Sequence, residues 1–180
     1  MNLPEKIVAL HRALQAADLP HAFGGALALA WCTQRARGTI DIDINIFVSI
    51  EASMRVFEAL PEAVKNTAKQ RKILQEEGQV RLWWDKTPVD LFLNTTPFHQ
   101  QVAERLRWEQ FMNTDIPFLA CNDIAVFKAF FNRTQDWADL EAMRGAGTLN
   151  IEKVVAILST YLGRDDERIE KLLSLVGRTQ

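Results

Sequence analysis

Cysteine is scarce in this chain of 180 residues, and long uncharged apolar runs are missing. Two cysteines, Cys32 and Cys121, are too few to suggest the disulfide framework of a small secreted domain. No uncharged apolar stretch reaches the roughly 18 residues that a membrane span needs. The first ten residues include Glu5 and Lys6 and lack the apolar core of a signal peptide. These absences predict a reduced, cytoplasmic protein that makes no membrane contact.

A strong charge of either sign is also lacking. The formal net charge is -2, and 48% of the residues are hydrophobic, which excludes a wholly disordered chain. A chain of this length can bury a core as one domain, or as one domain with a small helical annex. The near-neutral charge excludes a general nucleic-acid coat. A basic stretch at Lys65–Lys72 stays open to two interpretations, a solvated helix face or a contact with an RNA acceptor.

The histidines and cysteines show no spacing that indicates a metal site or a catalytic pair. The histidines, His11, His21 and His99, are scattered, and neither cysteine has the ligand spacing of a zinc site. Nothing in the sequence places a cysteine beside a histidine for nucleophilic catalysis. The candidate chemistry therefore lies among the acidic residues.

Hydrophobic periodicity divides the chain into two parts. Helical patterns in the first part are interrupted by β-rich runs at 40–49, 79–84 and 88–93, with a hairpin turn between the last two. From residue 97 onward the pattern is helical. The predicted fold is α+β. It comprises a small mixed sheet flanked by helices over residues 1–96, and a C-terminal helical segment over residues 97–180 packed on that core.

Two carboxylates lie two residues apart in the first β-rich run. Asp41 and Asp43 alternate with Ile42 and Ile44. Residues two apart in a strand point to one face, so both acids project together, roughly 6 to 7 Å apart at the backbone. Carboxylate oxygens at this separation can share hard cations, and oxygen is the ligand that Mg²⁺ prefers. The spacing therefore predicts a metal site on the polar face of this strand.

Two further features indicate phosphate chemistry. Gly24-Gly25 precede a predicted helix, and glycines let backbone N–H groups approach an anion closely at a helix N-terminus. Asp90 lies in a Val-Asp-Leu run and joins the other acids if its strand lies beside theirs. It would then serve as a metal ligand or general base; otherwise it is a solvated strand acid. A triphosphate at the glycines, facing metal-bound acids, forms a coherent phosphoryl-transfer site.

These motifs resemble the signature of the nucleotidyltransferase superfamily, which has the DNA polymerase β-like fold. They are most similar to the bacterial branch that includes the AbiEii-type toxins. The similarity covers residues 20–142 and rests on Gly-Gly, Arg-x-Thr, Asp-x-Asp, a third acid, a lysine that ends a helical segment, and Arg-x-x-Asp-x-x-Asp-Leu. The matching residues are Gly24, Gly25, Arg37, Thr39, Asp41, Asp43, Asp90, Lys128, Arg133, Asp136 and Asp139.

The resemblance implies transfer of an NMP group from an NTP to an acceptor hydroxyl, with Mg²⁺ or Mn²⁺ as cofactor. The implied acceptor is an RNA such as tRNA, a protein side chain or a small molecule, and a toxin-type member would have a cognate antitoxin. Lys128 is implied to contact the triphosphate, and Asp136 to orient that lysine or the base. The implied catalytic and metal-binding acids are Asp41, Asp43 and Asp90, and the implied nucleotide-binding residues are Gly24, Gly25, Arg37, Thr39, Lys128 and Asp136.

Three alternatives stay open at this point. A catalytically silent protein of the same fold would use the cleft to bind a nucleotide or a partner. An unrelated α+β protein with a chance Asp-x-Asp would place Asp90 away from Asp41. Independently of the fold, Lys128 is either a triphosphate contact or a lysine whose stem lies over an apolar helix face.

Overall fold

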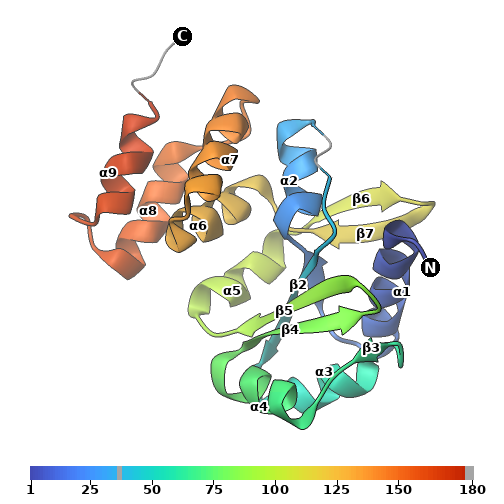
Figure 1. Cartoon of the computed structure of the whole chain (residues 1–180). Coiled ribbons are helices and arrows are strands. Elements are labelled where there is room, and N and C mark those ends of the chain that lie inside the picture. The colour runs from blue at the N-terminus through green and yellow to red at the C-terminus, as the bar shows by residue number, and fades with distance from the viewer. Residues whose placement is uncertain (36–37, 177–180) are drawn as a thin grey trace. The chain divides into compact units, whose positions relative to one another are not determined.

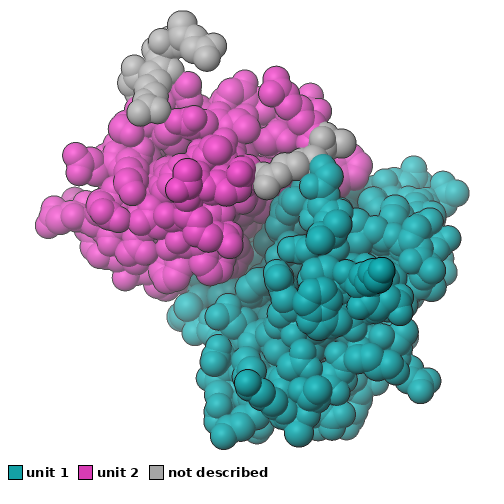
Figure 2. Space-filling model, in the orientation of Figure 1, with its two compact units in different colours: residues 1–27, 38–119 teal, residues 28–37, 120–180 magenta. Residues whose placement is uncertain are grey.

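The computed structural model describes residues 1–35 and 38–176, which form two compact units. Unit 1 comprises Met1–Leu27 and Gly38–Leu119. Unit 2 comprises Ala28–Arg37 and Ala120–Gln180, as far as those ranges are described. Figure 2 distinguishes the two units by colour, and the chain passes between them within one helix, α2, at Gly25–Thr33.

Unit 1 is built on a mixed sheet with the strand order β3-β4-β5-β2-β1-β7-β6 (Figure 1). The pairs β2–β5 and β1–β7 are parallel, and the other neighbours are antiparallel. This confirms the predicted mixed sheet. The strands are β1 (His21–Phe23), β2 (Ile42–Ser49), β3 (Val64–Lys65), β4 (Gln79–Trp84), β5 (Thr87–Asn94), β6 (Arg107–Phe111) and β7 (Thr114–Phe118).

Helices complete the core of unit 1. Helix α1 begins with a capping box, in which the Asn2 side chain accepts from the backbone N–H of Glu5 and the Glu5 carboxylate accepts from that of Asn2. Its fully buried Leu10 and the equally buried Ile44 of β2 belong to the apolar core. The helices of this unit are α1 (Leu3–Ala16), α3 (Ser53–Ala59), α4 (Ala68–Glu77) and α5 (Pro97–Val102), with 3-10 turns at Ile50–Ala52 and Ala103–Arg105.

The prediction that the chain is helical from residue 97 onward is wrong for β6 and β7. Their turn places Met112 and Asn113 in the left-handed region, at φ 48° and 59°, as a tight two-residue hairpin requires. Strand β7 then pairs with β1 through Phe23 and Phe118. The helical part of this stretch therefore ends with the 3-10 turn at Ala103–Arg105, and the hairpin that follows joins the sheet.

Unit 2 is helical. The predicted helical pattern is confirmed for this part of the chain, and its last two helices are capped by Asn150 and Asp166. The helices are α6 (Cys121–Phe131), α7 (Thr134–Gly145), α8 (Ile151–Leu162) and α9 (Glu167–Ser174), together with the later part of α2. None of the helices in the described ranges has the length and apolarity needed to cross a membrane.

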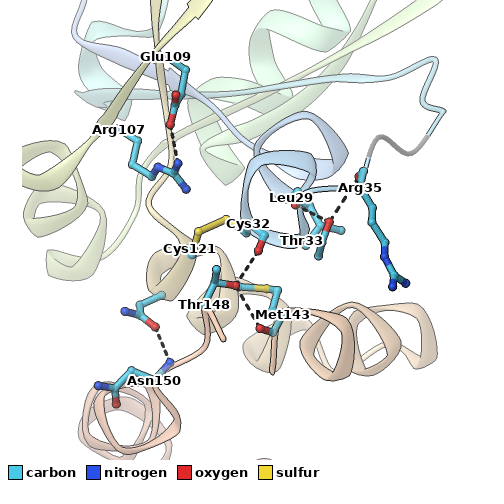
Figure 3. Close-up of a disulfide and its surroundings, with 11 residues drawn as sticks. Leu29, Cys32, Thr33, Arg35, Arg107, Glu109, Cys121, Met143, Thr148 and Asn150 are labelled. Atoms are coloured by element: carbon cyan, nitrogen blue, oxygen red, sulfur yellow. Dashed lines mark hydrogen bonds and ion pairs between the residues drawn. A yellow bond between two sulfur atoms is a disulfide. The ribbon is translucent and has the colours of Figure 1, made fainter. Parts of the chain in front are cut away.

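The two cysteines form a disulfide within unit 2, so the prediction of reduced cysteines is wrong. Cys32 in α2 and Cys121 at the start of α6 are 89 residues apart in sequence, yet their Cα atoms lie 5.5 Å apart (Figure 3). Thr148 supports the same junction, because its hydroxyl donates to the carbonyls of Cys32 and Met143 at 2.7 and 3.1 Å. Helix packing brings the sulfurs together, and sequence spacing carries no trace of it.

A buried histidine pair in unit 1 ties α1 to β1. His21 donates through Nδ1 to the Leu19 carbonyl at 2.7 Å, so its Nε2 accepts from Nδ1 of His11 at 2.9 Å. A neutral His21 satisfies both contacts, and both rings are at most 5% exposed. Burial lowers the pKa of His21 to about 4, against the opposing hydrogen bond to Leu19, and burial also lowers the pKa of His11.

We expect this pair to make stability fall with acidification. The unfolded chain protonates His21 near its ordinary pKa of 6.5, whereas the folded chain does so only near 4. Between these values the unfolded state binds more protons, so the free energy of unfolding decreases by about 3 kcal/mol as the pH falls from 6.5 to 4. Urea unfolding across this range should show the loss, and His21→Met should remove most of it. An identical pH slope in the variant would contradict the assignment.

Candidate functional site

Asp43 and Asp90 lie side by side on neighbouring parallel strands. In the register of β2 and β5, Asp43 is the partner of Asp90, and Ile42 is the partner of Val89. The flanking Ile42 and Ile44 are fully buried, which anchors one face of β2 in the core and leaves the acids on the other. The condition for Asp90 to join the acidic pair is therefore met, and the chance Asp-x-Asp interpretation, which separates these acids, is wrong.

Asp41 immediately precedes β2 and is fixed by its neighbour Thr39. The Thr39 hydroxyl donates to the Asp41 carbonyl at 3.3 Å and accepts from the Asp41 amide at 3.2 Å. The described contacts of Thr39 thus position the backbone of an acid, whereas its predicted nucleotide contact stays a prediction. Arg37, the other residue of the Arg-x-Thr motif, lies outside the described residues.

Gly24 and Gly25 lie directly against Asp43. The Gly24 amide donates to the Asp43 carbonyl at 2.9 Å, so this N–H group is already engaged. Because glycine has no side chain, a phosphate could still approach the backbone closely here. Gly25 begins α2 with φ +53°, and a Cβ built on it would lie 1.9 Å from Asp43 Oδ2. The sequence predicted that the glycines face the acids across a bound triphosphate, and the fold brings them into direct contact with Asp43.

Arg81 is the basic residue of this site that sequence reasoning missed. It extends from β4, next to Asp90 in the β4–β5 register, and its guanidinium donates to both Asp90 oxygens, from Nε at 2.7 Å and Nη2 at 2.6 Å. The same Nη2 lies 3.4 Å from Asp41 Oδ2. The hydrogen bonds to Asp90 raise the pKa of Arg81, and the charges of Asp41 and Asp43 add to that effect.

The donor set is compatible with a divalent cation. Asp41, Asp43 and Asp90 offer only carboxylate oxygens, the ligands that Mg²⁺ and Mn²⁺ prefer. One cationic nitrogen, Arg81 Nη2, already forms ion pairs with both Asp41 and Asp90. In the part of the chain that the structure describes, no three acidic, histidine or cysteine side chains are arranged around a metal position.

Replacing Gly25 by alanine is expected to disturb Asp43. The new Cβ would meet Oδ2 at 1.9 Å and Cγ at 2.5 Å, so the carboxylate has to turn away. The left-handed backbone adds about 1 to 2 kcal/mol of strain. We expect Mn²⁺ affinity to fall about tenfold or more, equivalent to roughly 1.4 kcal/mol.

Gly38→Ala is the matched control, because no heavy atom of the described residues beyond its chain neighbours lies within 4 Å of a Cβ built at Gly38. Mn²⁺ titration and urea unfolding of both variants measure the two effects separately. Wild-type Mn²⁺ affinity in Gly25→Ala would show that the Asp43 carboxylate is not part of a metal site.

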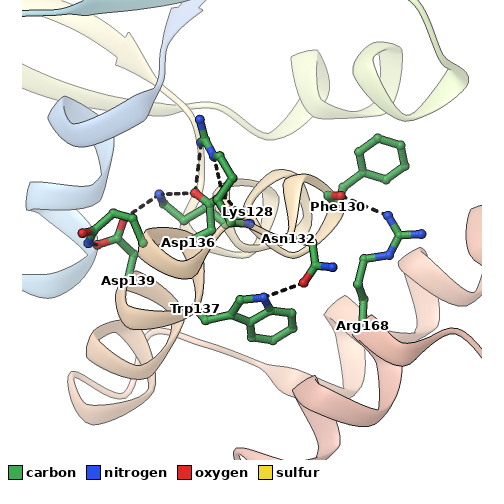
Figure 4. Close-up of polar contacts among 9 residues, drawn as sticks. Lys128, Phe130, Asn132, Asp136, Trp137, Asp139 and Arg168 are labelled. Carbon is green, nitrogen blue, oxygen red and sulfur yellow. Dashed lines mark hydrogen bonds and ion pairs between the residues drawn. The ribbon is translucent and has the colours of Figure 1, made fainter.

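A second cluster of charges lies in unit 2 around Lys128 (Figure 4). The Lys128 ammonium donates to Asp139 at 2.6 Å and to Asp136 at 3.3 Å, and Arg133 donates to Asp136 from Nε at 2.7 Å. Burial alone would raise the pKa of Asp136, but the hydrogen bond from Arg133 and the nearby Lys128 charge lower it. The side chain of Lys128 is only 12% exposed, which contradicts the interpretation as a lysine that merely extends over an apolar face.

Comparison with known proteins identifies the fold. A scan of protein-family models and a search of curated proteins give no match. Among solved structures, the antibiotic-resistance factor ANT(2'')-Ia in solution aligns with a TM-score of 0.56 at 15% identity, over 97% of this chain and 90% of that one. A crystal structure of ANT(2'')-Ia with adenylyl-2''-tobramycin aligns with a TM-score of 0.53 at 14% identity, over 98% and 96% of the two chains.

A third solved structure is also similar in fold. An antigenic nucleotidyltransferase-like protein from Paracoccidioides brasiliensis aligns with a TM-score of 0.54 at 11% identity, over 94% of this chain and 92% of that one. At these identities the likeness concerns the fold alone. The chain therefore has a nucleotidyltransferase-like fold, as predicted, whereas the AbiEii-type branch stays a prediction.

Proposed function

We propose that this chain transfers an NMP group from an NTP to the hydroxyl of an acceptor, with Mg²⁺ or Mn²⁺ as cofactor. The observation that carries the proposal is the row formed by Asp43 and Asp90 on adjacent parallel strands, with Gly25 against the Asp43 carboxylate. The fold is that of proteins described as nucleotidyltransferases, and the sequence resemblance implies catalytic roles for these acids.

The proposed chemistry assigns a role to each of the three acids and to the two glycines. Asp41 and Asp43 would hold the cation, which neutralises charge on the phosphates and orients them when bound. Asp90 would be a further ligand of the cation, or would accept the proton of the acceptor hydroxyl as its oxygen attacks the α-phosphorus. A new oxygen–phosphorus bond forms, the bond between the α-phosphorus and the bridging oxygen breaks, and pyrophosphate leaves. Gly24 and Gly25 would let the phosphates approach the backbone.

Lys128 and Asp136 enter the proposal through the resemblance. The described ammonium of Lys128 is neutralised by Asp136 and Asp139. A phosphate contact from Lys128 would replace part of that pairing, and Asp136 would then orient the lysine. The nucleotide contacts of Arg37 and Thr39 likewise belong to the proposal.

For the acceptor we propose a small polyhydroxylated molecule as the first class to test. The support is the ANT(2'')-Ia complex, whose ligand is an adenylylated tobramycin, and which this chain matches over 96% of its length. RNA, including tRNA, and a protein side chain are the next classes. A toxin-type role with a cognate antitoxin rests on the resemblance alone.

Label transfer tests the proposal. Each α-labelled NTP is incubated with the protein and Mg²⁺, together with aminoglycosides, total RNA or a cell protein extract. We expect label to move to one acceptor class with release of pyrophosphate, and to remain on the NTP with Asp41→Asn/Asp43→Asn. Mg²⁺-dependent NTP binding without transfer to any acceptor would favour the silent nucleotide-binding module instead.

A further inference from the structure

Three charged residues on three adjacent strands form one row. Arg81 of β4 is paired in register with Asp90 of β5, and Asp90 is paired with Asp43 of β2. Arg81 alternates with Val80 and Leu82, which are at most 8% exposed, so the strand period keeps its side chain on the face of the acids.

The Arg81 guanidinium is bound to the carboxylates that a metal ion would need as ligands. Its Nε and Nη2 bind the two oxygens of Asp90 at 2.7 and 2.6 Å, a bidentate geometry that engages both oxygens at once. Its Nη2 also reaches Asp41 at 3.4 Å. The side chain of Asp90 is only 15% exposed, so little of this carboxylate stays open to a second cation.

We propose that Arg81 is an internal counter-cation that competes with the divalent metal for Asp90 and Asp41 and thereby sets the metal affinity of the site. The inference rests on the proposed function, because it takes the metal to be the ligand of the same acids. It assigns a regulatory role to a residue that the motifs of the resemblance do not include.

Electrostatics favours an exchange rather than joint occupancy. Without a cation, carboxylates from adjacent segments repel one another, and Arg81 relieves that repulsion. A divalent ion ligated directly by Asp90 would stand close to a guanidinium of like charge. The Arg81 side chain is 51% exposed and can swing into solvent without opening the core. Metal binding therefore includes the free energy of breaking the Arg81 pairs.

Metal titration of the full chain without nucleotide tests the exchange. Free Mn²⁺ is measured by electron paramagnetic resonance during titration of wild type, Arg81→Gln and Arg81→Lys. We expect Arg81→Gln to bind Mn²⁺ about tenfold more tightly than wild type, and Arg81→Lys to lie between them because lysine keeps the charge and loses the fork. Mn²⁺ should also raise the unfolding midpoint more in Arg81→Gln than in wild type.

Lys86→Gln is the matched control, since it removes one positive charge from the exposed β4–β5 turn of the same hairpin. If Arg81→Gln binds Mn²⁺ no more tightly than Lys86→Gln, or more weakly than wild type, the competition is overturned while the metal site stands. If Arg81→Gln does not fold, tighter binding by Arg81→Lys than by wild type still supports the competition, and equal binding overturns it. If no variant and no wild-type protein binds Mn²⁺, the proposed metal site fails together with this inference.

Discussion

Replacing Asp43 by asparagine is expected to abolish Mg²⁺-dependent NTP binding while the fold survives. Asp43 lies beside Asp90 in the β2–β5 register and against Gly25, so its carboxylate is central to the row of acids. Asparagine keeps the shape but removes the negative charge that a cation requires. We expect NTP affinity in Mg²⁺ to fall at least about a hundredfold, roughly 2.7 kcal/mol, in isothermal titration.

Stability separates this loss from unfolding. An acid held among other acids for function costs stability, so Asp43→Asn should unfold at the wild-type urea midpoint or above it. Asp115→Asn, which changes an exposed acid on β7, is the control and should bind NTP as wild type does. Unchanged Mg²⁺-dependent NTP affinity in Asp43→Asn would remove this residue from the site.

Replacing Lys128 by methionine is expected to destabilise unit 2 severely. The ammonium is paired with Asp139 and Asp136, whose side chains are 9% and 1% exposed. Without it both buried carboxylates lose the cation that binds them, although the Gln135 side chain still donates to Asp139 at 3.0 Å. We expect the free energy of unfolding to fall by about 3 kcal/mol in urea titration.

Two further variants test whether this loss of stability comes from the ion pairs of Lys128. Lys153→Met changes an exposed lysine of α8 and should have little effect. Lys128→Met/Asp139→Leu removes both charges and should be more stable than Lys128→Met alone. A loss below about 1 kcal/mol in Lys128→Met would show that the cluster is solvated and leave the lysine available for other roles.

Local patterns carried much of the acidic site. The period-2 alternation around Asp41 and Asp43 identified β2 and its polar face, because the buried isoleucines can face only one side of a sheet. The runs at 79–84 and 88–93 match β4 and β5 closely. The place of Asp90 needed one further fact, the parallel pairing of β2 with β5, which a sequence leaves open.

The residues that were missed depend on register and tertiary packing. Arg81 has the sequence appearance of a solvated strand cation, and only the β4–β5 register brings it to Asp90. The β6–β7 hairpin has short strands with weak alternation, and its identity comes from joining β1. The Cys32–Cys121 disulfide follows from helix packing within unit 2. These features depend on contacts between segments that are distant in the sequence, and hydrophobic periodicity describes only the local structure of each segment.

Thermal unfolding with each NTP, with and without Mg²⁺, tests the central claim most directly. A ligand that binds only the folded state stabilises it by about 2.7 kcal/mol at a concentration of a hundred times its Kd. For a chain of this size that corresponds to a rise of roughly 5 to 10 °C in the unfolding midpoint. We predict such a rise with at least one NTP, dependent on Mg²⁺ and absent from Asp41→Asn/Asp43→Asn. No rise with any NTP, or an equal rise in the double variant, would contradict a metal-dependent nucleotide site at these acids.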